Sequence, residues 1–310
     1  MPEDKLDDFT MWQNLSSELT MGNIKALARS ISLVENEQQG YEQFMASLPA
    51  NGGGRVIGVT GSPGAGKSTL VDGLIKDLVA QQYKVGVLCV DPSSPFNLGA
   101  VLGDRIRMSS WYTHPDVYIR SLATRGSMGG LHPKIIEVTD LLKAALFDYI
   151  IVETVGVGQS EIEIAGLADT TVVVLVPEGG DEVQTMKAGL MEIADIFVVN
   201  KSDRPGADAF VKTLRLMLAP AFNRHTAEVP IVKTVAAQHS GIAELVQKIG
   251  EHQESLLVNT KRTWLLAERA WQMIQQNRMK GITRKQLAAS IESEKGASFN
   301  LYRFVENYIK

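Results

Sequence analysis

The sequence lacks the features that are typical of secreted and membrane proteins. Its single cysteine, Cys89, cannot form an internal disulfide and lies in the apolar run 85–90, so we expect a core residue. No apolar run approaches the ~20 residues that a membrane-spanning helix needs. Residues 1–8 are polar and acidic, unlike a secretory signal. We therefore expect a cytoplasmic protein without a membrane partner.

An excess of charge of one sign is also lacking. The chain has 31 basic and 35 acidic residues, a net charge of −4. Nucleic-acid-binding proteins usually carry a basic face, so we expect no nucleic-acid partner. The sequence has no Cys-x-x-Cys motif, and its five histidines are scattered. Proteins that deliver metals usually need such a cluster, which disfavours a nickel-type metallochaperone.

Three regions differ in their hydrophobic pattern. Residues 1–50 form a predicted N-terminal helical extension, because Ile24, Leu27, Ile31 and Val34 recur every three or four positions. Residues 51–255 alternate short apolar runs with helical stretches. Residues 256–310 form a predicted C-terminal helical extension with an apolar stripe from Trp264 to Ile274.

The apolar runs of the central region are too uniformly apolar for half-exposed strands. They fit strands that are buried on both faces of a mainly parallel sheet. The expected fold class is therefore α/β, with three layers and helical extensions at both ends, and the phosphate-loop motif G-x-x-x-x-G-K-[ST] at residues 61–68 makes it a three-layer P-loop NTPase fold. The runs comprise 56–59, 85–90, 117–119, 149–152, 171–176, 196–199 and 231–232.

A phosphate-binding motif follows the first apolar run of the central region. The sequence matches G-x-x-x-x-G-K-[ST] between a predicted strand and a predicted helix, the context that this motif requires. Its glycines allow backbone N–H groups to face phosphate oxygens, and the helix directs its positive end at the same place. Lys67 adds a cation for the β- and γ-phosphates, and Ser68 is a predicted Mg²⁺ ligand. The predicted phosphate-binding residues are Gly61, Ser62, Pro63, Gly64, Ala65, Gly66, Lys67, Ser68 and Thr69.

A second motif indicates which base is bound. Asn200-Lys201-Ser202-Asp203 follows an apolar run, so we expect it at the carboxyl end of a strand, where α/β sheets place ligands. N-K-x-D is typical of guanine recognition, because the aspartate accepts hydrogen bonds that adenine does not offer. Asn200 either contacts the purine or braces the phosphate loop. A second base-contacting loop is expected at Val235, Ala236 and Ala237. GTP and GDP are thus the predicted ligands.

Acidic residues supply candidate Mg²⁺ ligands. Glu153 ends an apolar strand, Asp91 ends another, and Asp104 lies in the long loop between 92 and 115. Mg²⁺ takes one or two carboxylates together with phosphates and water, so the three acids cannot all be direct ligands. Gly156 can present its N–H to the γ-phosphate, and Val157 follows where many GTPases place a water-orienting glutamine. We therefore expect slow intrinsic hydrolysis, with Lys67, Glu153 and Gly156 as the predicted catalytic residues.

Six motifs in sequence order resemble the MeaB/ArgK family of P-loop GTPases. The resemblance covers residues 55 to about 240, whereas the flanking helical regions are similar in layout only. The motifs are Val59 to Thr69, Val90 to Pro95, Leu102 to Met108, Val152 to Ser160, Gly180 to Lys187 and Asn200 to Asp203.

The resemblance implies a Mg²⁺-dependent GTPase that acts as a chaperone of an adenosylcobalamin-dependent acyl-CoA mutase, most often methylmalonyl-CoA mutase. It implies that such a protein gates cofactor loading and protects the mutase. It also implies that Gln184 and Lys187 belong to a switch, and that the chain forms a homodimer through its C-terminal helices. The alternative is a protein kinase or ATPase linked to lysine, arginine and ornithine transport, an older label of the same family.

Overall fold

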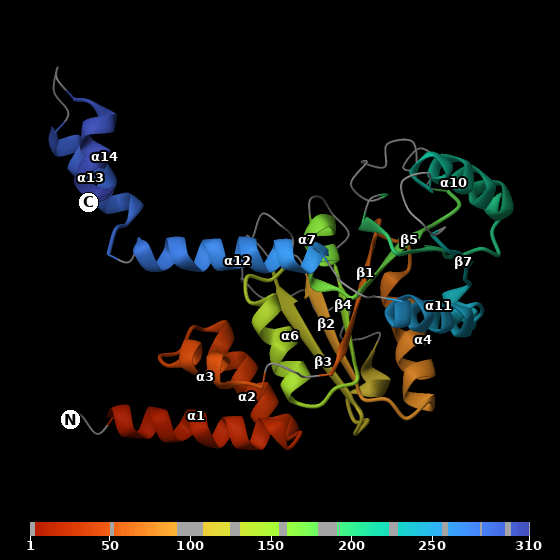
Figure 1. Ribbon diagram of the computed structural model, residues 1–310. Coiled ribbons are helices and arrows are strands. Elements are labelled where there is room, and N and C mark those ends of the chain that lie inside the picture. Colours follow the sequence, from red (N-terminus) through yellow and green to blue (C-terminus); the bar gives the residue numbers. More distant parts are fainter. Residues whose placement is uncertain are drawn as a thin grey trace. The chain divides into compact units, whose positions relative to one another are not determined.

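The computed structural model consists of two compact units, Met1–Arg262 and Thr263–Lys310, which are described separately (Figure 1). The structure describes residues 4–49, 53–91, 108–124, 131–154, 160–178, 191, 193–222, 229–255, 260–279, 281–294 and 299–309.

The first unit is built around a seven-stranded, all-parallel sheet with the strand order β3-β2-β4-β1-β5-β6-β7. The expected α/β fold with a parallel sheet is confirmed, and each predicted apolar run lies in or overlaps a strand. Because all strands run in one direction, their carboxyl ends meet at one edge of the sheet. The strands are β1 Arg55–Gly61, β2 Val85–Asp91, β3 Val117–Ala123, β4 Tyr149–Glu153, β5 Thr170–Leu175, β6 Ile196–Val199 and β7 Ile231–Lys233.

Consecutive residues of β5 pack into different cores, which explains why its sequence is apolar throughout. Val172 and Val174 belong to a core formed with helices α4 (Lys67–Ala80) and α11 (Ile242–Ser255). Val173 and Leu175 belong to a second core, formed with α10 (Ala207–Phe222). Side chains of a strand alternate between its two faces, so helices cover both faces of the sheet (Figure 1).

Two further helices, α6 (Ile135–Ala144) and α7 (Ser160–Leu167), complete the sandwich of the first unit. Helix α6 contacts β4, and α7 contacts β1 and β5. Helices α4 and α7 each follow a strand whose carboxyl end lies at the same sheet edge. Gly61 at the end of β1 and Glu153 at the end of β4 therefore lie at that edge.

Three N-terminal helices, α1 (Asp4–Thr20), α2 (Ile24–Glu35) and α3 (Tyr41–Ser47), form the predicted helical region before the sheet. Leu27, Ile31 and Val34 are buried as the spacing predicts, whereas Ile24 at the start of α2 is exposed. Helices α1 and α2 pack against α6. A groove of about 730 Å³ between α1 and α3 is lined by uncharged residues, among them Phe9 and Trp12.

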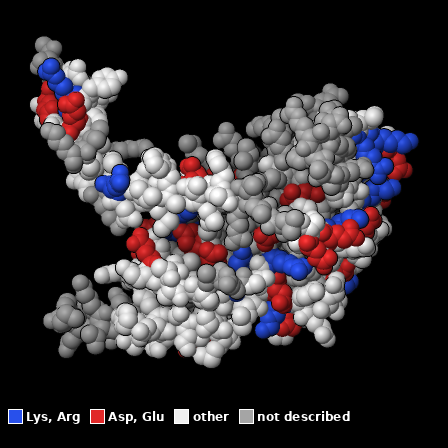
Figure 2. Space-filling model, in the orientation of Figure 1, with Lys and Arg blue, Asp and Glu red and all other residues white. Residues whose placement is uncertain are grey.

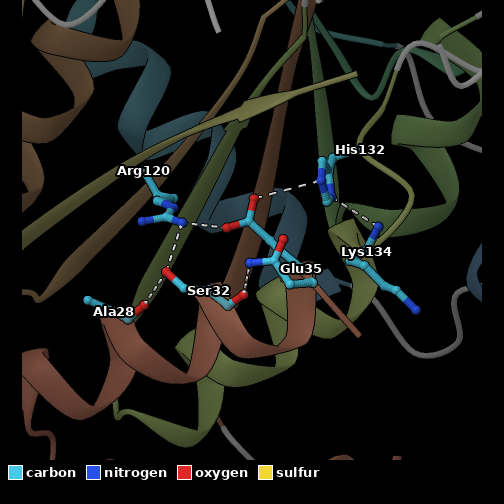
Figure 3. A network of polar contacts seen from close by, with 7 residues as sticks. Ala28, Ser32, Glu35, Arg120, His132 and Lys134 are labelled. Atoms are coloured by element: carbon cyan, nitrogen blue, oxygen red, sulfur yellow. Dashed lines mark hydrogen bonds and ion pairs between the residues drawn. The ribbon is translucent and has the colours of Figure 1, made fainter. Parts of the chain in front are cut away.

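A polar network attaches α2 to the rest of the unit (Figure 3). Arg120 of β3 forms an ion pair with Glu35 and donates a hydrogen bond to Ser32 Oγ at 3.2 Å. His132 Nδ1 accepts from the backbone N–H of Lys134, and its Nε2 lies 3.7 Å from Glu35. The network fixes the N-terminal helices to the edge strand and to the start of α6.

The second unit contains part of α12 (Thr260–Arg278) together with α13 (Arg284–Glu294) and α14 (Leu301–Ile309). Phe304 is the buried hydrophobic residue among the residues described in this unit, and it packs against Phe299 and Tyr308. Trp264 and Trp271, in the predicted apolar stripe, are 63% and 59% exposed. The apolar stripe of α12 is therefore largely exposed and is not buried in a core of this unit.

Acidic and basic side chains are intermixed on the face of the molecule seen in Figure 2, and the surface over α1–α3 is mostly uncharged there. This distribution agrees with the small net charge of −4. In the described parts of the chain, no helix has both the length and the apolar composition that crossing a membrane requires.

Candidate nucleotide site

The phosphate loop lies between β1 and α4, as the motif predicts. Gly66 has a φ of 89°, and a Cβ at this position would lie 2.4 Å from Asn200 Nδ2. A side chain would therefore be excluded both by the backbone conformation and by the neighbouring amide. Lys67 Nζ donates hydrogen bonds to the carbonyl oxygens of Gly61 at 2.8 Å and of Ser62 at 3.0 Å. The loop thus curls around the ammonium group of its own lysine.

The first turn of α4 faces the end of β4. The Ser68 hydroxyl donates a hydrogen bond to Glu153 Oε1 at 2.7 Å, and both side chains are buried. Beside them, Thr154 Oγ1 donates to Thr60 Oγ1 at 2.8 Å. Two oxygen ligands predicted for Mg²⁺, which lie 85 positions apart in the sequence, are therefore in direct contact. Buried carboxylate and hydroxyl oxygens at a phosphate loop suit this hard cation.

Asn200 connects three loops at the carboxyl edge of the sheet. Its Nδ2 donates to the carbonyl oxygen of Ala65 at 2.8 Å. Its Oδ1 accepts from Thr234 Oγ1 at 3.1 Å and from the backbone N–H of Ala236 at 3.0 Å. Asn200 is only 2% exposed. Of the two roles that the sequence left open, the structure has Asn200 bracing the phosphate loop.

The other residues of the tetrapeptide lie at the surface of this edge. Lys201, which has a φ of 56°, donates from Nζ to the carbonyl oxygen of Gly64 at 2.7 Å. Asp203 is exposed, so its carboxylate is accessible from solution. Arg204 donates to Glu178 Oε1 at 2.5 Å, and this hydrogen bond lowers the pKa of the Glu178 carboxyl. The predicted base-recognition loop is thus tied to the phosphate loop and to Glu178, which follows β5.

The predicted second base-contacting loop follows β7. Ala236 begins a short 3₁₀ helix, Ala236–Gln238, and its N–H meets Asn200 as described above. Val235 is half-buried and Ala237 is exposed. The structure therefore brings this loop beside Asn200.

Not all predicted site residues fall within the described part of the chain. Asp91 ends β2 two residues after Cys89, which is in register with Glu153 of β4, so its backbone lies at the same sheet edge. Asp104, Gly156, Gln184 and Lys187 lie outside the described residues, as does Val157.

Sequence reasoning missed several residues that connect the elements around this edge. Thr234 contacts Asn200, and His239 Nε2 lies 2.7 Å from Asp77 Oδ1 of α4. Trp111 Nε1 donates to Asp72 Oδ1 at 2.7 Å on the same helix. None of these residues belongs to a recognisable motif, and each partner is distant in the sequence. No sequence pattern indicated Thr234, because its contact with Asn200 depends on the pairing of β6 with β7.

Comparisons with known proteins agree with this geometry. The chain is 49% identical over 250 residues to a putative GTPase of Pyrococcus abyssi, covering 79% of this chain and 77% of the relative. It is 35% identical over 234 residues to the fused isobutyryl-CoA mutase of Geobacillus kaustophilus, covering 71% of this chain and 22% of that protein. The crystal structure of an LAO/AO transport system kinase superimposes with a TM-score of 0.68 at 25% identity, covering 97% of this chain and 98% of that one.

The family model described as methylmalonyl-CoA mutase-associated GTPase MeaB matches residues 27–293 of the 310. The match includes the phosphate loop, the strand that ends in Glu153 and the Asn200–Asp203 tetrapeptide. The resemblance found from the sequence motifs is therefore confirmed, and the chain belongs to the MeaB family of mutase-associated GTPases.

Proposed function

We propose that this protein is a Mg²⁺-dependent GTPase that acts as a nucleotide-controlled chaperone of an adenosylcobalamin-dependent acyl-CoA mutase. The observation that carries the proposal is the position of Asn200, whose side chain joins the phosphate loop to both predicted base-contacting loops. Such an arrangement makes the phosphate and base halves of the site interdependent.

In the proposed site, each group has a separate task. Lys67 neutralises the β- and γ-phosphates, and the N–H groups at the start of α4 bind phosphate oxygens. Asp203 accepts hydrogen bonds from guanine, because an unpaired carboxylate would disfavour adenine. Val235, Ala236 and Ala237 form the other wall of the base site.

Ser68 and Glu153 are the residues that would hold Mg²⁺, with Asp91 and Asp104 as further candidates. When bound, the ion neutralises charge that develops on the transferring phosphoryl group. Glu153 would in addition orient the Ser68 hydroxyl, whose proton it accepts in the structure. Gly156 would sense the γ-phosphate, and Gln184 and Lys187 would act as switch residues that respond to a docked mutase.

A mutase client is supported by the name of the matching family and by the fused relative, in which a similar segment is covalently joined to an isobutyryl-CoA mutase. The client is proposed to be methylmalonyl-CoA mutase or another mutase that acts on an acyl-CoA. The protein would act in the cytoplasm as a homodimer formed through its C-terminal helices. The exposed apolar stripe of α12 supports this dimer.

A pull-down from the native organism, with and without a non-hydrolysable GTP analogue, tests the proposal. We expect an acyl-CoA mutase in the eluate whose amount depends on the nucleotide. A nucleotide-independent eluate without any such mutase would contradict the chaperone function.

Protein phosphorylation is the second candidate, and the name of the superimposed transport system kinase favours it. The two candidates differ in where the γ-phosphoryl group goes. With γ-labelled GTP, a chaperone GTPase releases free phosphate, whereas a kinase transfers the label to a protein. Label transfer to protein in stoichiometric amounts would favour the kinase.

A further inference from the structure

A loop-to-helix contact lies outside the motifs that define the proposed site. His239 follows the 3₁₀ helix Ala236–Gln238, and its Nε2 lies 2.7 Å from Asp77 Oδ1 of α4. The side chains are 33% and 20% exposed. A carboxylate accepts hydrogen bonds, so Nε2 carries the proton in this contact. The two residues are 162 positions apart and join the helix of the phosphate loop to the loop that follows β7.

The loop is tightly folded around this contact. His239 has a φ of 59°, a conformation that is uncommon for residues other than glycine. Its N–H donates to the carbonyl oxygen of Ala236, and the bridge between Val235 and Ser240 closes the turn. The conformation that directs His239 toward α4 is thus the same one that presents the predicted base-contacting residues.

The α4 side of the contact is shaped for a close approach. A Cβ added at Gly73 would lie 3.2 Å from Ile242 and 3.5 Å from His239 Nδ1. Gly73 and Asp77 are four residues apart and therefore lie on the same face of the helix. The imidazole lies against the helix backbone at one position and bonds to a carboxylate one turn later.

Asp77 occupies an electrostatically unfavourable position. Helix α4 ends at Ala80, so the carboxylate lies in the last turn, near the negative end of the helix dipole. Replacing Asp77 by alanine should therefore favour the helix itself. Any loss of nucleotide binding in such a variant would come from the missing contact with His239 and not from a weakened helix.

We propose that His239 and Asp77 form a clamp that holds the base-contacting loop on the phosphate-binding helix, which makes both of them positioning residues for guanine nucleotide. The proposal rests on the proposed function, because it assumes that the edge formed by Asn200 binds guanine nucleotide. The clamp and Asn200 hold opposite ends of the same loop. Asn200 accepts a hydrogen bond from the N–H of Ala236, and Asp77 bonds to the side chain of His239.

The test compares three variants of the full-length protein with the wild type. His239→Asn removes the contact but tolerates the left-handed backbone, and Asp77→Ala removes the acceptor. Asp77→Asn keeps an oxygen that accepts the His239 proton. We measure KM and kcat for GTP, and the dissociation rate of a fluorescent GDP. The first two variants should raise KM and the GDP dissociation rate about three- to tenfold, the range expected for one hydrogen bond, with kcat changed less than about twofold. Asp77→Asn should behave like the wild type.

His252→Asn is the matched control. His252 also bridges a helix and the sheet through Thr170 Oγ1 at 2.9 Å and Asp195 at 3.7 Å, but at the amino-terminal edge of β5 and β6. This variant should leave KM unchanged. The double variant of His239→Asn and Asp77→Ala should have the same KM and GDP dissociation rate as either single variant, because both substitutions remove the same interaction.

Two kinds of failure are distinguishable. A wild-type protein that does not bind GTP would overturn the proposed function. A wild-type protein that binds GTP, with His239→Asn and Asp77→Ala binding equally well, would overturn the clamp alone. An equal loss in His252→Asn, or in Asp77→Asn, would also overturn it, since the effect would then be one of general stability. If His239→Asn does not fold, Asp77→Ala decides.

Discussion

In the unit Met1–Arg262, strands and helices bury hydrophobic side chains on both faces of a sheet, whereas in the unit Thr263–Lys310 Phe304 is the buried hydrophobic residue among those described. The first unit therefore has the close packing that holds its sheet edge in one arrangement. The second exposes aromatic and aliphatic side chains, including Trp264, Trp271 and Tyr302. Exposed apolar surface of this kind is typical of segments that are covered by another chain.

The difference indicates a division of tasks. The described residues that are predicted to bind phosphate, metal and base are held by contacts within the first unit, such as the 2.7 Å hydrogen bond between Ser68 and Glu153. The second unit contributes none of the predicted nucleotide-binding residues. We therefore expect substitutions in the first unit to change nucleotide chemistry, and substitutions in the second to change self-association.

The largest expected effect is that of Lys67→Ala. It removes the cation of the phosphate loop, so hydrolysis should be abolished and GTP binding weakened by about 3 kcal/mol, roughly 100-fold. Phosphate release and calorimetric titration measure the two effects, and the oligomeric state should not change. Unchanged GTP affinity would refute the role of Lys67.

Asp203→Asn should change base selectivity by about the factor by which Lys67→Ala weakens GTP binding. An amide in place of the carboxylate no longer accepts both guanine hydrogen bonds, but it donates to the additional oxygen of xanthine. Competition between GTP and XTP should therefore shift toward XTP by about 100-fold, since polar pockets discriminate sharply between partners. Selectivity that stays with guanine would show that the base is recognised elsewhere.

Trp271→Glu tests the second unit. A charge placed in the apolar stripe of α12 should weaken the proposed dimer by about 2 kcal/mol, roughly thirtyfold, the loss typical of a central aromatic contact. Sedimentation analysis measures the dimer, with Gln272→Glu, which adds the same charge to the neighbouring position, as the control. GTP affinity should be unchanged. A dimer that is indifferent to Trp271→Glu would exclude this stripe from the interface.

Glu163→Gln should have the smallest effect, and only on stability. Burial raises the pKa of the Glu163 carboxyl in α7, so the folded state binds its proton more tightly than the unfolded state. Its contribution to stability therefore falls as the pH rises above the ordinary glutamate pKa. Thermal unfolding should show a more stable variant at neutral pH and no difference well below the ordinary pKa. A difference that persists in acid would exclude ionisation as the cause.

Much of the fold and of the site could be predicted because it depends on local sequence. The apolar run 171–176 is buried on two faces, so its composition alone indicates a central parallel strand. The phosphate loop and the Asn200–Asp203 tetrapeptide are each one continuous stretch of sequence, and the conformation of each depends on its own residues. The predicted order of strand, loop and helix was sufficient to predict that both segments lie at one edge of the sheet.

The missing parts depend on which strands become neighbours. Asn200 can contact Thr234 and Ala236 only because β6 pairs with β7, and the sequence contains no signal for that pairing. The contact between His239 and Asp77 depends on how α4 and the loop after β7 meet across 162 positions. Polar contacts between distant elements follow from packing, and single-sequence patterns do not report packing.

The most direct test of a nucleotide-controlled chaperone is phosphate release by the full-length protein, measured alone and with an adenosylcobalamin-dependent acyl-CoA mutase from the same organism. We predict slow GTP hydrolysis by the protein alone and a several-fold acceleration when the mutase is added. Equal rates with and without the mutase, or hydrolysis of ATP in preference to GTP, would contradict the account.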